Sequence, residues 1–170
     1  MQELQINGED FNVINELNEL SIKKFNELIE IFQSNSTFEI EKQVQLVKVL
    51  SNNLISEDDL MDLPMTVFEN MVELINIGDN DHPIQDTFTY DNVVFTLKGD
   101  STNFIFTVNQ SINTIKAMRE DDIRYVANMM SFIYENKDFS AAERATIFND
   151  NMTMDYATPF LQILRDKYEK

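Results

Sequence analysis

Acidic clusters and a single histidine are the residues of this chain best suited to chemistry. His82 is the only histidine, and Asp79 and Asp81 stand close to it in the sequence. A metal site needs several ligands in a defined geometry, and the chain offers neither a second His nor any Cys. We therefore expect His82 to be a solvated residue and not a metal ligand.

Two runs of acids are the next candidates. Glu57-Asp58-Asp59, with Asp62, could gather a hard cation, but the run lacks the Gly and the bidentate Glu spacing of a calcium loop. Glu120-Asp121-Asp122 could include a general acid, yet no partner base or nucleophile is identifiable. Acids also favour the positive end of a helix dipole, so we expect both runs to start helices. The sequence predicts no catalytic residue, no metal site, no cofactor and no enzymatic activity.

Methionines and phenylalanines late in the chain form a different kind of candidate. Methionine is flexible and polarisable, which suits an adaptable binding groove, although filling a core is its more common use. The candidate partner-binding residues are Met129, Met130, Phe132, Met152, Met154 and Phe160.

Composition favours a folded, helical chain. With 170 residues, 43% hydrophobic content and thirteen Phe, the chain can bury a substantial core. Three Gly and three Pro are few, which favours long helices over a turn-rich β fold. The absence of Cys fits a reducing compartment, and no secretory signal or membrane-spanning run is visible. We expect a soluble protein of the cytoplasm.

The formal charge of −17 is unevenly distributed. Residues 1–83 hold seventeen acids against four lysines, whereas residues 84–170 hold thirteen acids against nine basic residues. Such a charge repels nucleic acid phosphates and anionic membranes, so neither is an expected partner. A solvated surface, attraction of a basic partner and mimicry of nucleic acid charge all remain open as its meaning.

Turn and capping signals predict the elements of the first half. Asn7-Gly8 between alternating runs predicts a hairpin over residues 4–13. A stripe from Ile22 to Phe32 predicts a helix, and Ser36 with Glu39 predicts a capping box for the next one. Ser56 starts a short helix, and Pro64 separates it from a further helical stripe that ends at Gly78.

The second half shows similar signals. Strand-forming residues over 87–108 predict a longer hairpin around Lys98-Gly99-Asp100. A helical stripe runs from Ile112 to Ile133, and Ser140 with Glu143 predicts another capping box. A last helix follows Met152-Thr-Met-Asp155 and contains Pro159 near its start.

The two halves echo each other in the order hairpin, helix, helix, short helix, helix. Val47–Leu50 lies opposite Met130–Ile133, and Pro64–Phe68 lies opposite Met152–Tyr156. We expect a mainly α fold with small antiparallel β hairpins, an α+β arrangement of two related helical lobes, with an internal duplication as one explanation. The predicted division is an acidic N-terminal lobe at 1–78, a linker at 79–86 and a C-terminal lobe at 87–170.

Several segments resemble the small assembly proteins of tailed bacteriophages, most of all the tail assembly chaperones. The segments are Ser21–Leu28, Leu46–Ser51, Ser56–Pro64 and Val67–Met71 in the first half, and Ser131–Tyr134, Arg144, Phe148 and Met152–Tyr156 in the second. The resemblance implies a protein without catalytic residues that binds a phage structural protein, such as the tape measure or another tail or head component. A doubled arrangement in one chain departs from the shorter members of that family.

The leading hypothesis is therefore a non-enzymatic phage assembly or accessory protein. A structural component of the virion, in the tail, the neck or the head interior, is the first alternative. An acidic inhibitor that mimics DNA is the second. The expected partner is a phage structural protein, and a homo-oligomer is a further arrangement left open.

Overall fold

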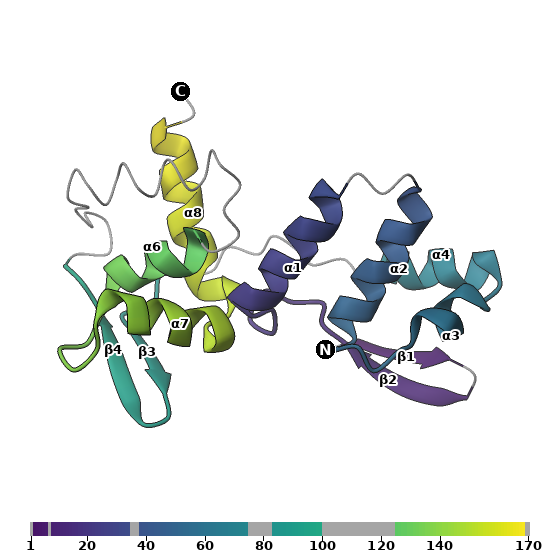
Figure 1. Cartoon of the computed structure of the whole chain (residues 1–170), viewed down its shortest axis with the longest axis horizontal. Coiled ribbons are helices and arrows are strands. Elements are labelled where there is room, and N and C mark those ends of the chain that lie inside the picture. Colours follow the sequence, from purple (N-terminus) through teal and green to yellow (C-terminus); the bar gives the residue numbers. More distant parts are fainter. Residues whose placement is uncertain (1, 7, 35–37, 75–82, 100–124, 169–170) are drawn as a thin grey trace. The chain divides into compact units, whose positions relative to one another are not determined.

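A computed structural model describes residues 2–6, 8–34, 38–74, 83–99 and 125–168 of the chain (Figure 1). Over these residues it contains seven helices and two small antiparallel sheets of two and three strands, which confirms the predicted α+β class. The elements are β1 (Gln2–Ile6), β2 (Glu9–Val13), α1 (Ile22–Gln33), α2 (Glu39–Leu50), α3 (Glu57–Met61), α4 (Met65–Leu74), β3 (Thr87–Tyr90), β4 (Val93–Leu97), α6 (Tyr125–Ile133), β5 (Tyr134–Glu135), α7 (Ala141–Asn151) and α8 (Met154–Tyr168).

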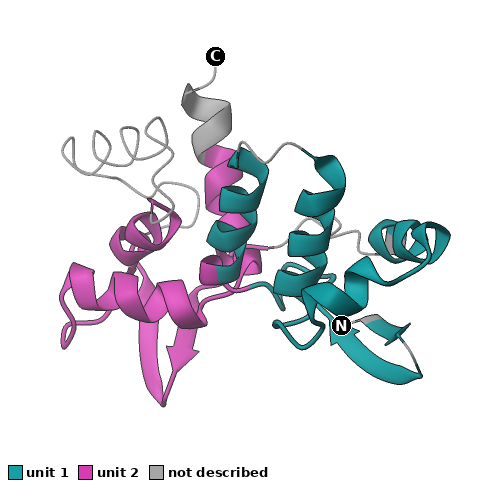
Figure 2. Cartoon of the chain, turned by 45° about the vertical axis from the view of Figure 1, so that its right-hand side comes forward, with its two compact units in different colours: residues 1–20, 24–80 teal, residues 21–23, 81–170 magenta. Residues whose placement is uncertain are grey.

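The chain divides into two compact units (Figure 2). Unit 1 comprises residues 1–20 and 24–80, and unit 2 comprises residues 21–23 and 81–170. The division at residue 80 falls inside the predicted linker 79–86, but residues 85 and 86 bond to unit 2. The Gln85 carbonyl accepts a bond from the Tyr134 hydroxyl, and the Leu97 amide donates to the Asp86 carbonyl.

The N-terminal hairpin forms as predicted. Ile6 pairs with Glu9 across a two-residue loop, in which Gly8 has a φ of +85°. Glycine takes a positive φ without the steric cost that a Cβ imposes. The side chains of Leu4, Ile6 and Val13 are buried, and the Ile14 amide donates to the Leu50 carbonyl at 3.0 Å. The hairpin is thereby joined to the end of α2.

The second hairpin turns earlier than predicted. The chain reverses at Asp91-Asn92, where both residues have positive φ, and Tyr90 pairs with Val93. Asp and Asn tolerate the left-handed region better than other non-glycine residues, so this dipeptide supports a tight turn. Lys98-Gly99 follows β4, and the longer hairpin predicted around Lys98-Gly99-Asp100 stays a prediction. The partner strand expected over 104–108 lies outside the described residues.

Helix starts match the sequence where the capping bonds are local. Ser56 accepts a bond from the Asp59 amide at the start of α3. Ser140 and Glu143 form a complete capping box at the start of α7, which holds the pKa of Glu143 below its usual value through the Ser140 hydroxyl and amide. At α2, however, the N-cap is Phe38, which makes no side-chain capping bond. The predicted cap Ser36 lies outside the described residues.

The core of unit 2 is a cluster of aromatic rings. Phe148 on α7 packs edge-on against Phe88, Phe95 and Tyr134, with ring centroids 5.4, 5.0 and 6.5 Å away. Tyr134 also meets Tyr156 and Phe160 of α8 at 6.3 and 6.2 Å. The rings come from β3, β4, β5, α7 and α8, so this cluster joins the small sheet to the helices. Edge-to-face pairs of this kind stabilise a core beyond the area they bury.

A short strand completes the sheet of unit 2. Tyr134 and Glu135 pair with Leu97 and Thr96, so β5 lies beside β4 directly after α6. The sequence stripe assigned Ile133 to a helix and predicted no strand after it. The described part of unit 1 contains only the β1–β2 pair, and α7 is longer than α3. The internal duplication therefore stays a prediction, and the segment 109–112 on which it depends lies outside the described residues.

The apolar stripe of α1 is only partly covered. Ile22 and Leu28 are buried and Phe25 is half-buried, but Phe32 at the end of the helix is 57% exposed. Helical periodicity places all four on similar faces, yet burial also requires a neighbouring element to cover the last turn. The prediction that Phe32 is a core residue is wrong.

Candidate functional site

Five of the six candidate partner-binding residues lie in the core of unit 2. Met129, Met130, Met152 and Phe160 are fully buried, and Met154 is nearly so. Phe132 is half-buried. Their burial matches the core-filling use of methionine, and a role in contacting a partner stays a prediction. More accessible apolar surface lies elsewhere.

The described candidates for metal or acid–base chemistry do not come together as a site. His82 and Glu120-Asp121-Asp122 lie outside the described residues. Asp59 receives a bond from the Ser56 hydroxyl, as expected at a helix start. Within the described ranges, no three His, Cys, Asp or Glu side chains are grouped so that they could hold a metal ion.

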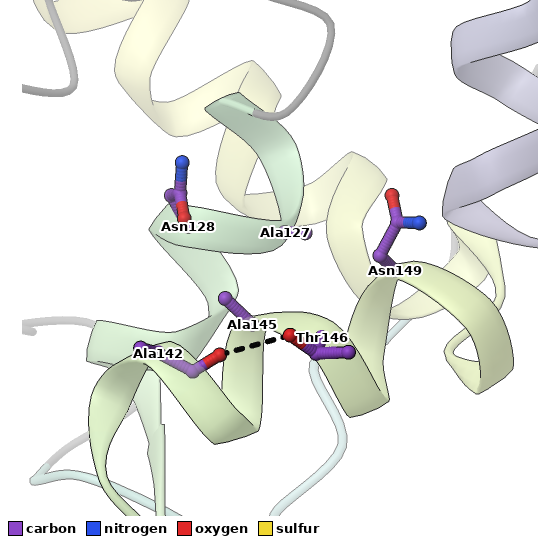
Figure 3. Close-up of a pocket in the computed structure, with 6 residues that line it drawn as sticks. All are labelled: Ala127, Asn128, Ala142, Ala145, Thr146 and Asn149. Atoms are coloured by element: carbon purple, nitrogen blue, oxygen red, sulfur yellow. Dashed lines mark hydrogen bonds between the residues drawn. The ribbon is translucent and has the colours of Figure 1, made fainter.

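Unit 2 has a groove between α6 and α7 with a neutral lining (Figure 3). Its volume is about 380 Å³, and it is lined by Ala127, Asn128, Ala142, Ala145, Thr146 and Asn149. The Thr146 hydroxyl is already engaged, because it donates to the Ala142 carbonyl at 3.2 Å. Small side chains and two amides offer this groove little beyond close helix packing.

Unit 2 also contains a buried polar network. Asp155 accepts bonds from the Gln85 amide at 3.1 Å and from the Thr153 hydroxyl, while the Tyr134 hydroxyl donates to the Gln85 carbonyl. Burial raises the pKa of Tyr134, and the neighbouring Tyr156, Asp86 and Asp155 raise it further. A phenol held neutral in this way is a hydrogen-bond donor and a poor base. The network fastens the chain before β3 to the start of α8.

Exposed large apolar side chains are concentrated in unit 1. Of ten such residues in the described part of the chain, seven belong to unit 1 and three, Tyr90, Val94 and Ile163, belong to unit 2. The unit 1 residues are Phe32, Phe38, Ile40, Leu54, Met61, Met65 and Val67. Single exposed apolar residues are ordinary, but a concentration of them in one region is typical of binding surfaces.

Three helices of unit 1 line a groove, here called the acidic groove, and one of these exposed residues, Met61, is part of its lining. Its volume is about 540 Å³. The apolar lining comes from Ile31 on α1, Val44 and Val49 on α2, and Met61 on α3. The polar lining consists of Glu27, Glu30, Ser34, Glu41, Lys42, Gln45 and Glu57.

Helical spacing accounts for this lining. On α1, Glu30 and Ile31 lie three and four residues after Glu27, and Ser34 directly after the helix lies three and four residues beyond them, so the four residues share one side. Glu57 and Met61 of α3 are likewise one turn apart. Among the described residues, Glu27 and Glu30 make no ion pair, whereas Glu57 lies 3.7 Å from the Lys48 ammonium and accepts a bond from Gln45 at 2.9 Å.

A reciprocal pair of lysine bonds holds α1 and α2 together. Lys24 on α1 donates to the Val49 carbonyl in the last turn of α2, at 3.2 Å. Lys42 on α2 donates to the Phe32 carbonyl in the last turn of α1, also at 3.2 Å. Each ammonium thus lies at the negative end of the neighbouring helix dipole. Among the described lining residues Lys42 is the one cation against four glutamates, so the groove carries an excess of negative charge.

The acidic groove can bind but offers no arrangement for catalysis among its described residues. Its apolar floor can desolvate an inserted side chain, and its carboxylates can pair with cations at the rim. Sequence reasoning missed the groove because the bonds that form it join residues of α1 and α2 that are far apart in the chain. In the part of the chain that the structure describes, no helix is both long and apolar enough to cross a membrane.

Comparisons with known proteins give no match to this chain. No family model, no curated protein and no solved structure resembles it closely enough to be matched.

Proposed function

We propose that the chain is a non-enzymatic binding protein that holds a phage structural protein during assembly, in the manner of a tail assembly chaperone. The observation that carries the proposal is the number of exposed apolar side chains in the described part of unit 1, one of which, Met61, lines the acidic groove. The phage context rests on the sequence resemblance alone. In this proposal the protein acts in the cytoplasm of an infected host.

The mechanism is the covering of apolar surface on an unassembled partner. A structural protein that is synthesised before its assembly exposes surface that will later be buried, and such surface aggregates. Exposed residues such as Leu54 and Met65 supply apolar contact area, while the net charge of −17 keeps the complex soluble. Release follows when assembly offers the partner a larger interface.

The direct test is capture of the partner followed by a solubility assay. The tagged chain is used to isolate partners from infected cells, and mass spectrometry identifies them. Each captured structural protein is then expressed with and without the chain. The proposal predicts that the chain raises its soluble fraction several-fold, and that Leu54→Ser with Met65→Ser reduces this effect. An unchanged soluble fraction contradicts the proposal.

Purified virions separate the proposed function from its first alternative. An assembly chaperone is absent from virions, whereas a structural component of the tail, neck or head is present at a fixed copy number. Quantitative mass spectrometry of purified particles therefore decides between the two.

A further inference from the structure

The acidic groove of unit 1 has features that specify the kind of partner segment it would take, and the inference below rests on the proposed function. The groove combines an apolar floor with a rim of glutamates on different helices. Glu27 and Glu30 lie on α1, Glu41 on α2 and Glu57 on α3. A segment that fits both features carries apolar residues on one side and cations along its edges.

We infer that the acidic groove binds a basic amphipathic helix of the partner protein. Grooves between helices commonly receive such a helix through apolar anchors spaced three and four residues apart. Here Met61 is 62% exposed and can adapt its flexible side chain to an anchor, while Val44, which also lines the groove, is buried and serves as part of the floor. Lysines and arginines beside the anchors reach the glutamates of the rim.

Charge distinguishes this occupant from others. Glu27 and Glu30 are one turn apart on α1, and like charges at that spacing repel each other. Neither has an ion-pair partner among the described residues, so a cation at this place relieves the repulsion. A second copy of this chain is a poor occupant, because it brings a net charge of −17 to a negative surface.

The lysine bonds at the two ends of the groove keep it available. Lys24 and Lys42 are bonded to the Val49 and Phe32 carbonyls, so they hold α1 and α2 together. The groove is thereby preorganised, which lowers the entropy cost of binding.

The experiment uses the full chain and synthetic peptides as probes. The test peptide is a fluorescein-labelled helix of about eighteen residues, in which leucines form one face and lysines the other. One control peptide replaces each lysine by glutamate, and a second has the composition of the test peptide in an order that scatters the leucines. Fluorescence anisotropy measures binding at several salt concentrations. We expect the test peptide to bind at least ten-fold more tightly than either control. The first control keeps only the apolar face, and the second keeps only the positive charge.

Matched variants locate the site. Glu27→Gln with Glu30→Gln removes two rim charges, and Glu3→Gln with Glu9→Gln removes two exposed charges from the β1–β2 hairpin outside the groove. We expect the rim pair to weaken peptide binding about ten-fold at low salt and the hairpin pair less than two-fold. Met61→Ser, at an exposed position, should weaken peptide binding at low and at high salt alike, because it removes an apolar contact.

Three results would overturn the inference. They are equal effects of the two double variants, equal binding of the scattered peptide, and no effect of Met61→Ser. A concentration-dependent doubling of mass without peptide binding would assign the groove to a second copy. If a captured structural protein is still kept soluble by the rim variants, the proposed function stands and this assignment of the groove fails. If the peptide binds the groove but no partner is kept soluble, this assignment of the groove stands and the proposed function fails.

Discussion

Both units bury a core, but they differ in how many large apolar side chains stay exposed: seven in unit 1 and three in unit 2 among the described residues. In unit 2, the rings of Phe88, Phe95, Tyr134, Phe148 and Phe160 are all buried, and they contact one another across five elements. In unit 1, side chains of comparable size stand in solvent. Natural selection removes exposed apolar surface that has no use, because it promotes aggregation. Among the described residues, unit 1 therefore offers the more accessible apolar surface.

The largest expected difference concerns two phenylalanines. Phe148→Ala should cost about 3–5 kcal/mol of unfolding free energy, because it removes a fully buried ring and leaves a cavity. Phe32→Ala, at a 57% exposed position, should change stability by less than about 0.5 kcal/mol. Urea denaturation followed by circular dichroism measures both. A similar loss of unfolding free energy in the two variants would contradict the difference in exposure between the two side chains.

Arg144 provides a second test of how tightly unit 2 is organised. Its guanidinium donates to the Ser131 carbonyl at 3.0 and 2.9 Å and to the carbonyls of Asn136 and Phe139. Arg144→Met should destabilise unit 2 by about 2 kcal/mol. The substitution leaves the carbonyls of Ser131, Asn136 and Phe139 without the guanidinium that donates to all three. Arg144→Lys should recover only part of this loss, because an ammonium cannot reproduce the planar fork. Lys137→Met, on the exposed turn before α7, is the control.

Alkaline pH should weaken unit 2 through Tyr134. Its pKa in the folded chain is raised above the ordinary value of 10.0, so the unfolded chain loses the phenolic proton first. The stabilisation is complete below pH 10 and declines as pH rises above it. Tyr134→Phe should reduce the slope of stability against pH between about pH 10 and 11, and Tyr90→Phe, at an exposed position, should not. Identical slopes would show that the phenol is not held neutral as described.

The smallest effect on stability should come from the exposed residues of unit 1. Leu54→Ser and Met65→Ser should each change the free energy of unfolding by less than about 0.5 kcal/mol, because both side chains already face solvent. Binding of a hydrophobic dye should fall in the same variants. Val94→Ser in unit 2 is the matched control, and an equal loss of dye binding there would remove the contrast between the units.

Local signals in the sequence predicted much of the fold. The Asn7-Gly8 turn, the Ser56 cap and the capping box of Ser140 with Glu143 depend on residues within a few positions of each other, and all three form. The Asp91-Asn92 turn was equally local, but strand-forming residues on both sides concealed it. Strand β5 could not be predicted in this way, because its pairing with β4 joins residues 96 and 135.

The candidate site could not be predicted from such local signals. Helical periodicity predicts which residues share a face, and Ile31 and Phe32 both fit an apolar stripe. It does not tell whether a neighbouring helix covers that face. The acidic groove depends on the bonds of Lys24 and Lys42 to distant carbonyls, and those lysines appear in the sequence as ordinary surface residues. The methionines of unit 2 are the opposite case. Their composition suits a binding surface, but Met129, Met130, Met152 and Met154 fill a core.

The isolated bridge between Ser21 and Thr153 has a consequence for synthesis. With the bond from the Ile22 amide to the Met152 carbonyl at 2.9 Å, it makes residues near the start of the chain part of unit 2. A ribosome adds about 5–20 residues per second, so roughly 4–15 seconds separate the completion of residue 80 from that of residue 153. During this interval the residues of unit 1 have all been made while unit 2 still lacks Thr153, the bridge partner of Ser21. The apolar surface of unit 1 is therefore available on the nascent chain before the aromatic core of unit 2 can close.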